Sequence, residues 1–196
     1  ERLEDVLAEA NGGKMPEKIA LFTPRQVMPS SLVDYCRRLV GAGNVVDAQE
    51  LYYKIKYEKS PREMELVKDA ALIADAAMEA MLRVLKPGML ETQVAAWGYF
   101  AARSLGAEEL GFDIMVGANE ANRTLIGKAL NRPIREGDWV HLGVGAKRDG
   151  LNACVRRSVV AVPSPADVPA EKKYWFNLVE EAYRVDPNGI VSVRIT

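Results

Sequence analysis

The sequence predicts a mixed α/β fold in two parts, and three patterns support this prediction. Residues 136–162 form two apolar runs around an Asp149-Gly150 pair, which is typical of a β-hairpin. Residues 61–105 hold two successive helical patterns. Residues 18–57 alternate strand-like and helical runs, and this stretch is too short for a complete α/β domain.

The hairpin places the residues of greatest chemical interest on one face. We expect residues 147–150 to form its loop. Because side chains alternate along a strand, that loop sets which residues share a side of the sheet. Three facing pairs are then expected: Gly143 with Cys154, His141 with Arg156, and Trp139 with Ser158.

Composition excludes several classes of partner. The chain has 196 residues, 48% of them hydrophobic and 27% charged, with a net charge of −1, so we expect a globular protein that binds neither nucleic acid nor an anionic membrane. No apolar run approaches the roughly 20 residues of a membrane span, and no signal segment opens the chain. Cys36 and Cys154 fit no disulfide framework or CxxC motif. These features predict reduced thiols and a cytoplasmic location.

The first 58 residues are expected to alternate helices and strands. Predicted helices are residues 1–10, 30–40 and 47–57, and predicted strands are residues 18–22 and 44–46. Asp47 with Glu50 resembles a capping box for the third helix.

The clearest helix start is Ser60-Pro61-Arg62-Glu63, with Ser as N-cap and Pro in the first turn. Apolar residues then recur at spacings of three and four until Lys86-Pro87-Gly88. We expect this stripe to pack on a sheet or a second helix, with a coiled-coil seam as the alternative. Its members are Met64, Val67, Ala71, Ala74, Met78, Met81 and Leu85.

Three more elements are predicted downstream. Residues 91–105 are a helix with Val94, Ala95, Gly98, Ala101, Ala102 and Leu105 inward, and residues 110–117 are a strand. Residues 170–184 are a helix with Trp175, Leu178, Val179 and Ala182 on one face. Residues 189–196 alternate as a strand does.

Motifs at separated sites resemble the creatinase, Xaa-Pro aminopeptidase and methionine aminopeptidase superfamily. Lys59-Ser60-x-x-Glu63 and Lys86-Pro87-Gly88-x-x-Glu91 are similar to the start and stop of the first catalytic-domain helix, and the hairpin is similar to "GD-x-V-x-x-D-x-G … G-x-x-x-D-x-T-R-T". The resemblance implies the pita-bread fold for residues 59–196, as its first half, preceded in residues 1–58 by the end of a creatinase-type N-terminal domain. It also implies a homodimer and a second half that supplies further metal ligands.

The resemblance also shows which groups are missing. Gly143 and Cys154 occupy the slots of two metal-bridging Asp residues, and Ile126 occupies the slot of an active-site histidine. A metal site needs about three converging ligands, and the chain holds one histidine. We therefore expect neither a metal site nor another cofactor.

Four residues are the candidate substrate-binding groups, while catalytic residues stay unassigned: Phe112, His141, Cys154 and Arg156. Phe112 lies in a stretch that resembles the family strand beneath the active site. His141 is expected to be a half-buried sheet residue, or else a lone general base. Cys154 is either a thiolate favoured by nearby arginines or a small buried hydrophobe. Arg156 would favour an acidic ligand, because a guanidinium binds carboxylates.

The resemblance implies a hydrolase of the M24 peptidase or creatinase type, acting on a peptide or a small C–N-bonded substrate. The lost carboxylates argue against the standard two-metal mechanism. The alternative is a catalytically silent binding module, or a structural module within a dimer, on the same fold. Whether the chain is an enzyme stays open at this level.

Overall fold

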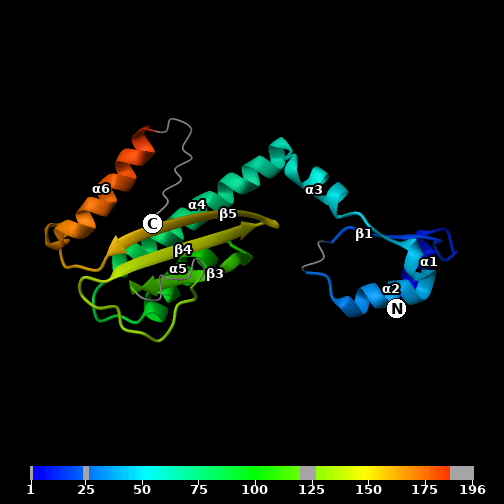
Figure 1. Ribbon diagram of the computed structural model, residues 1–196, viewed down its shortest axis with the longest axis horizontal. Helices are drawn as coiled ribbons and strands as arrows, with labels where there is room; N and C mark the ends of the chain where they lie inside the picture. Colours follow the sequence, from blue (N-terminus) through cyan, green and yellow to red (C-terminus); the bar gives the residue numbers. More distant parts are fainter. Residues whose placement is uncertain (1, 24–26, 120–126, 186–196) are drawn as a thin grey trace. The chain divides into compact units, whose positions relative to one another are not determined.

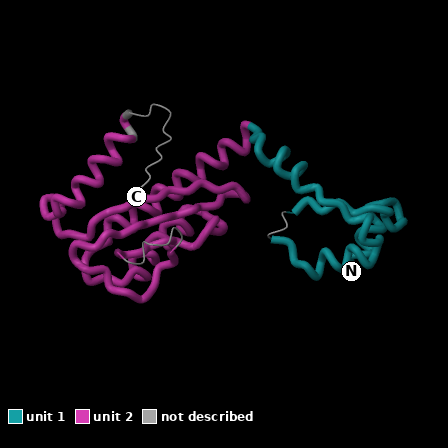
Figure 2. The backbone as a smooth tube through the Cα atoms, viewed as in Figure 1, with its two compact units in different colours: residues 1–60 teal, residues 61–196 magenta. Residues whose placement is uncertain are grey.

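A computed structural model describes residues 2–23, 27–119 and 127–185 of the chain. The chain divides into two compact units, residues 1–60 and residues 61–196 (Figure 2). Each unit has its own sheet (Figure 1). None of the helices in the described part of the chain is both long and apolar enough to span a membrane.

The first unit is built on a two-stranded parallel sheet. Ile19 pairs with Val45, and the helix between the two strands ends at Gly41, whose φ is 86°. Asp47 Oδ1 accepts from the Gln49 amide at 2.9 Å, which ties the second strand to the following helix. The elements are α1 (Leu3–Ala10), β1 (Ile19–Leu21), α2 (Ser30–Val40), η1 (Ala42–Asn44), β2 (Val45–Asp47) and α3 (Gln49–Tyr57). The predicted alternation of helices and strands is confirmed.

The second unit is a three-stranded antiparallel sheet, ordered β3-β4-β5, with α4 and α5 on one face. Helix α4 packs along β4 and β5, and α5 packs on α4 and β3 (Figure 1). The elements are α4 (Pro61–Val84), α5 (Glu91–Ser104), β3 (Glu109–Ala118), β4 (Trp139–Arg148), β5 (Leu151–Val160), η3 (Pro165–Asp167) and α6 (Ala170–Val185). The predicted helix and strand types are confirmed, and the closing strand predicted at residues 189–196 lies outside the described residues.

The core of this unit lies between the helices and the sheet. Val140, Leu142 and Val144 of β4 are fully buried. Gly98 lets α5 approach closely, because a Cβ there would lie 2.8 Å from both Ile114 Cδ1 and Met81 Sδ. The side of β4 that faces away from α4 and α5 carries His141, Gly143 and Gly145.

Some predicted inward positions were wrong. Met64 of α4 is 43% exposed and Leu105 is 53% exposed, because α4 begins before its contact with the sheet and Leu105 follows the last turn of α5. On α6, Trp175 and Val179 are exposed. Phe176 contacts the sheet instead, with its ring centroid 4.8 Å from that of Trp139.

The hairpin loop is shorter than predicted. Arg148 pairs with Leu151, so the loop is Asp149-Gly150 alone. Their φ values of 51° and 80° are those of a type I′ turn, which needs positive φ at both central positions. Lys147 and Arg148 therefore remain in the ladder, and the register moves by two residues.

The corrected register changes the facing pairs and keeps the shared face. Gly143 pairs with Arg156, and Gly145 pairs with Cys154. His141 pairs with Ser158, and Trp139 pairs with Val160. Because the shift is an even number, the same side chains still lie on one side of the sheet.

Candidate functional site

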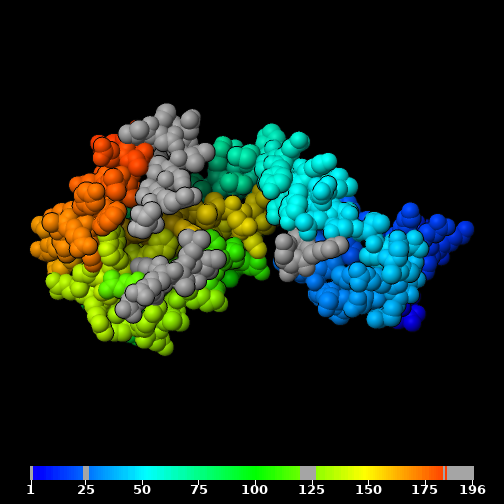
Figure 3. All heavy atoms as spheres, viewed as in Figure 1, coloured from blue at the N-terminus to red at the C-terminus, as the bar shows by residue number. Residues whose placement is uncertain are grey.

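The sheet face opposite α4 and α5 is organised in three rows that cross all three strands. One row is Phe112, Gly145 and Cys154; the next is Met115, Gly143 and Arg156; the third is Gly117, His141 and Ser158. The structure therefore brings the four candidate residues of the sequence analysis onto one face. Part of the gold β5 segment is visible at the surface of this unit in Figure 3.

The glycines of β4 are covered by side chains from β3. A Cβ added to Gly145 would lie 2.6 Å from Phe112 Cε1, and one added to Gly143 would overlap Met115 Cε. Irregularities in β3, between Leu110 and Phe112 and between Phe112 and Met115, bring these side chains to the glycines. The floor of the face is consequently apolar.

His141 is half-buried and bonded to its cross-strand neighbour, as the sequence predicted. Its Nδ1 lies 3.2 Å from Ser158 Oγ. Its Nε2 is shielded from solvent and has no hydrogen-bond partner in the described structure. Burial lowers the pKa of His141, and the positive charge of Arg156 lowers it further. The imidazole is therefore neutral at pH 7 and can accept or donate a proton.

Neither Arg156 nor Cys154 is fully buried. Arg156 is partly buried, and its Cζ lies 6.0 Å from the centroid of the Phe112 ring. Cys154 is exposed, so the expectation of a small buried hydrophobe was wrong at this position. Cys36 is buried, and both thiols are free in the structure. Ile126, in the family's histidine slot, lies outside the described residues.

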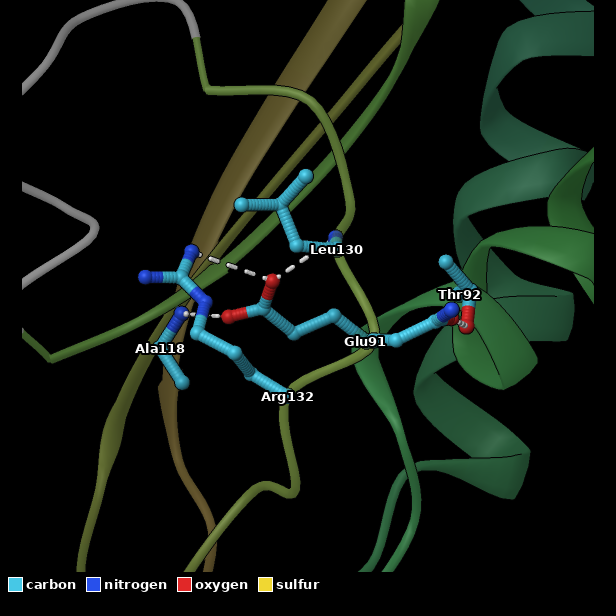
Figure 4. Close-up of polar contacts among 6 residues, drawn as sticks. Glu91, Thr92, Ala118, Leu130 and Arg132 are labelled. Atoms are coloured by element: carbon cyan, nitrogen blue, oxygen red, sulfur yellow. Dashed lines mark hydrogen bonds and ion pairs between the residues drawn. The ribbon is translucent and has the colours of Figure 1, made fainter.

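A second polar cluster surrounds Glu91, the last residue of the Lys86-Pro87-Gly88-x-x-Glu91 motif. The Glu91 side chain is fully buried. Its Oε1 accepts from the Ala118 amide at 2.9 Å, and its Oε2 accepts from the Leu130 amide at 2.9 Å and from Arg132 at 3.2 Å (Figure 4). The carboxylate thus joins the end of β3 to the segment that returns to β4.

Backbone pairing supports the same connection. The Glu91 amide donates to the Arg132 carbonyl at 3.0 Å, and Gly88 and Met89 exchange hydrogen bonds with Ile134 at 2.8 Å. Sequence analysis recognised Glu91 only as part of a motif. A glutamate at the start of a helix is ordinary, and its partners could be found only from the tertiary structure.

A cavity of about 250 Å³ lies beside Glu91, lined also by Asn119, Arg132, Arg135 and Asp138. Buried Asp138 accepts from the Arg135 amide at 2.8 Å and from the Asn119 side chain. Asn119 Oδ1 in turn accepts from the Trp139 amide at 2.9 Å. Both carboxylates on this cavity are therefore satisfied by the protein.

Comparison with known proteins places this fold in a family. The metallopeptidase family M24 profile matches residues 65–185. The chain belongs to metallopeptidase family M24. The partial pita-bread fold expected from the sequence is confirmed.

Curated relatives of this M24 chain include two peptidases. It is 33% identical over 129 residues to the uncharacterized peptidase YqhT of Bacillus subtilis, covering 66% of this chain and 36% of the relative. It is 24% identical over 157 residues to an Xaa-Pro dipeptidase of Pyrococcus horikoshii, covering 80% of this chain and 44% of the relative. The M24 chain thus spans less than half the length of these relatives.

Solved structures show the same fold. An X-Pro aminopeptidase from Thermotoga maritima matches with a TM-score of 0.76 and 25% identity, over 92% of this chain and 49% of that one. The prolidase from Pyrococcus furiosus matches with a TM-score of 0.71 and 21% identity, over 82% of this chain and 48% of that one. At this identity the prolidase likeness concerns the fold alone.

The described residues of this M24 chain do not provide the ligands for the metal ions that its family name implies. No group of three His, Cys, Asp or Glu side chains within the described residues could hold a metal ion. Gly143 offers no donor, and the methyl group of Met115 occupies the space of a side chain there. Cys154 lies diagonally from Gly143 and exposed to solvent. The described residues therefore do not form a two-metal site on this face.

Proposed function

We propose that this chain acts on a peptide or a small C–N-bonded substrate at the β4-β5 face, without the two-metal mechanism. The observation that carries the proposal is the His141 row. His141 is neutral because burial lowers its pKa, and it is bonded to Ser158 at 3.2 Å on the face where the resemblance puts the substrate. Membership of a peptidase family supports the reaction class.

In this proposal His141 is the proton-transfer group. A neutral imidazole whose shielded Nε2 is reached by the substrate can take a proton from a substrate group and return it to the leaving nitrogen. Ser158 fixes the ring orientation through Nδ1. The apolar cover formed by Phe112 and Met115 would limit water at the same face.

The test combines metal analysis with turnover. The purified full chain would be assayed on an Xaa-Pro dipeptide and on a proline-free dipeptide, with chelator, and with added manganese or cobalt. We expect chelator-resistant cleavage that falls at least about 100-fold in His141→Asn, the usual contribution of a general acid or base. Asn152→Ala, an exposed change on the same strand as Ser158, is the matched control and should retain activity.

Two other outcomes contradict this proposal in different ways. Two bound metals per chain with strictly metal-dependent cleavage would mean that groups outside the described residues complete a metal site. Binding without cleavage would support a catalytically silent module. That second candidate is favoured by one observation: His141 and Ser158 have no carboxylate neighbour on their row.

A further inference from the structure

The outer side of α4 and α5, which we call the α4-α5 face, carries large apolar side chains in contact with solvent. Leu72 and Phe100 are each 68% exposed, and Trp97 is 49% exposed. Burial of such side chains is favourable, and groups of them at a surface mark sites of interaction. Tryptophan is also among the residues that contribute most to the stability of protein interfaces. The α4-α5 face is therefore suited to a protein partner.

A groove of about 270 Å³ lies on this face where α4 meets α5. Its lining residues are Ala76, Glu79, Ala80, Arg83 and Val84 of α4 and Trp97 of α5. The two alanines leave space beside the indole ring, so an apolar side chain of a partner can enter there. Glu79 and Arg83 place charges at the same groove, which gives the face polar as well as apolar contacts.

Charged residues follow one side of α4 and of the turn after it. They are Asp75, Glu79, Arg83 and Lys86, and all four are exposed. Their spacings of four, four and three residues place them on one face of a helix. The helical turn extends past the end of α4, because the Leu85 amide donates to the Met81 carbonyl at 3.0 Å. Along this face the charges therefore read acid, acid, base, base.

This order of charges is complementary to itself when it is reversed. If two α4 helices pack antiparallel about a two-fold axis near Ala80, Asp75 faces Lys86 of the second copy and Glu79 faces Arg83 of the second copy. A parallel arrangement would instead place like charges opposite each other. Within one copy Glu79 pairs with Arg83 at 2.5 Å, whereas Asp75 and Lys86 have no ion-pair partner among the described residues.

The apolar groups fit the same two-fold axis. A two-fold interface uses the same patch on both copies, so a residue near the axis contacts its own copy. Ala80 and Trp97 line one groove, and the axis near Ala80 therefore brings both Trp97 side chains into the interface. A different protein would need a matching order of charges, whereas a second copy has this order by symmetry.

We propose that the α4-α5 face binds a second copy of this chain through an antiparallel, two-fold contact between two α4 helices. The charges from Asp75 to Lys86 set the direction of the contact, and Trp97 supplies its buried aromatic side chain. The resemblance implies a homodimer but no contact surface, and this proposal assigns a surface in the second unit. It is independent of the proposed function, because no residue of the β4-β5 face takes part.

Two charge-reversed variants of the full chain test this contact. Asp75→Lys with Glu79→Lys makes the charges wholly basic, and Arg83→Glu with Lys86→Glu makes them wholly acidic. Size-exclusion chromatography with light scattering would follow association over about 1–100 µM protein, because dimerisation depends on concentration. We expect the wild type to dimerise and each variant alone to do so at least about 100-fold more weakly, since like charges then face each other.

An equimolar mixture of the two variants gives the decisive result. We expect the mixture to dimerise as the wild type does, because the basic face of one variant then meets the acidic face of the other. This recovery would also show that both variants are folded. A mixture that stays monomeric, while both variants keep the circular dichroism spectrum of the wild type, would overturn the proposal.

Two further variants separate this face from the rest of the surface. Glu180→Lys with Glu181→Lys reverses two exposed glutamates of α6, with the same change in net charge as Asp75→Lys with Glu79→Lys, and should leave dimerisation unchanged. Trp97→Lys should weaken dimerisation at least about tenfold, as expected for an aromatic residue in an interface.

Three outcomes would contradict the proposal. A wild-type chain that stays monomeric over the whole concentration range would overturn it. Dimers that persist in both charge-reversed variants and in Trp97→Lys would place the contact on another surface. Binding of a monomeric wild-type chain to phosphatidylcholine vesicles, lost in Trp97→Lys, would assign the α4-α5 face to a lipid surface instead.

Discussion

Two polar clusters in the second unit differ in how completely the protein satisfies them. Glu91 is fully buried and its two oxygens accept from two backbone amides and one arginine. On the β4-β5 face, His141 Nε2 has no hydrogen-bond partner in the described structure, and the Arg156 guanidinium lies over the Phe112 ring. A cluster satisfied by the fold is structural, whereas one left open is suited to a ligand.

Replacing Glu91 tests the structural side of the comparison and should have the largest effect. Glu91→Ala leaves the Ala118 and Leu130 amides without their acceptor, and we expect a loss of about 3 to 5 kcal/mol in the free energy of unfolding. Urea unfolding of the full chain measures it. Glu91→Gln keeps one acceptor and should lose less.

Thr92→Ala is the matched control for Glu91. Thr92 is the next residue (Figure 4). Its hydroxyl donates an exposed hydrogen bond to Asn131 Oδ1 at 2.9 Å. We expect this change to cost less than about 1 kcal/mol. A cost at Thr92 similar to that of Glu91→Ala would mean that burial of the carboxylate is not what matters.

The second prediction concerns Gly143, which the Met115 side chain covers on the β4-β5 face. Gly143→Ala adds a Cβ where Met115 Cε lies, so we expect a loss of about 1–3 kcal/mol in the free energy of unfolding, the usual cost of overpacking. Met115→Ala removes the obstacle, so the cost of Gly143→Ala should become smaller in that background. Urea unfolding of the four chains gives this coupling energy.

Gly43→Ala is the control for the added methyl group. Nothing lies within 4 Å of a Cβ at Gly43, so the change should have little effect on stability. An unchanged cost of Gly143→Ala in the Met115→Ala background would show that Met115 is not the residue that fills the slot. The neighbours that remain in that background are the Cβ of residue 115, at 3.5 Å, and Arg156 Cγ, at 3.7 Å, and both are at ordinary van der Waals distances.

The helices and strands of the second unit were predicted well where the sequence signals were local. Ser60-Pro61-Arg62-Glu63 and Gly88 bracket α4, which runs from Pro61 to Val84. Asp149-Gly150 predicted the hairpin but not the loop length, because the same dipeptide suits a loop of about two or four residues. The shared face was still predicted, since an even error in register keeps every side chain on its side.

The features that the sequence did not predict depend on contacts between residues far apart in the chain. Glu91 bonds residues 27 and 39 positions away, and no local pattern shows such partners. Met115 covers Gly143 because of irregular pairing in β3, which periodicity does not reveal. The exposure of Cys154 follows from its place on β5, which among the described strands pairs with β4 and no other.

The last and smallest effect separates the two causes that lower the pKa of His141. Burial is the larger cause and the charge of Arg156 the smaller one, so Arg156→Gln should raise this pKa while leaving it below its ordinary value. A lowered pKa in the folded state means that the unfolded chain binds its proton first, so folding stability falls as the pH drops below about 6.5. In Arg156→Gln this fall should be shallower, and in Arg157→Gln unchanged. NMR titration of the single histidine and urea unfolding between about pH 7 and pH 5 measure the two quantities, and an unchanged pKa in Arg156→Gln would show that the guanidinium does not act on the imidazole.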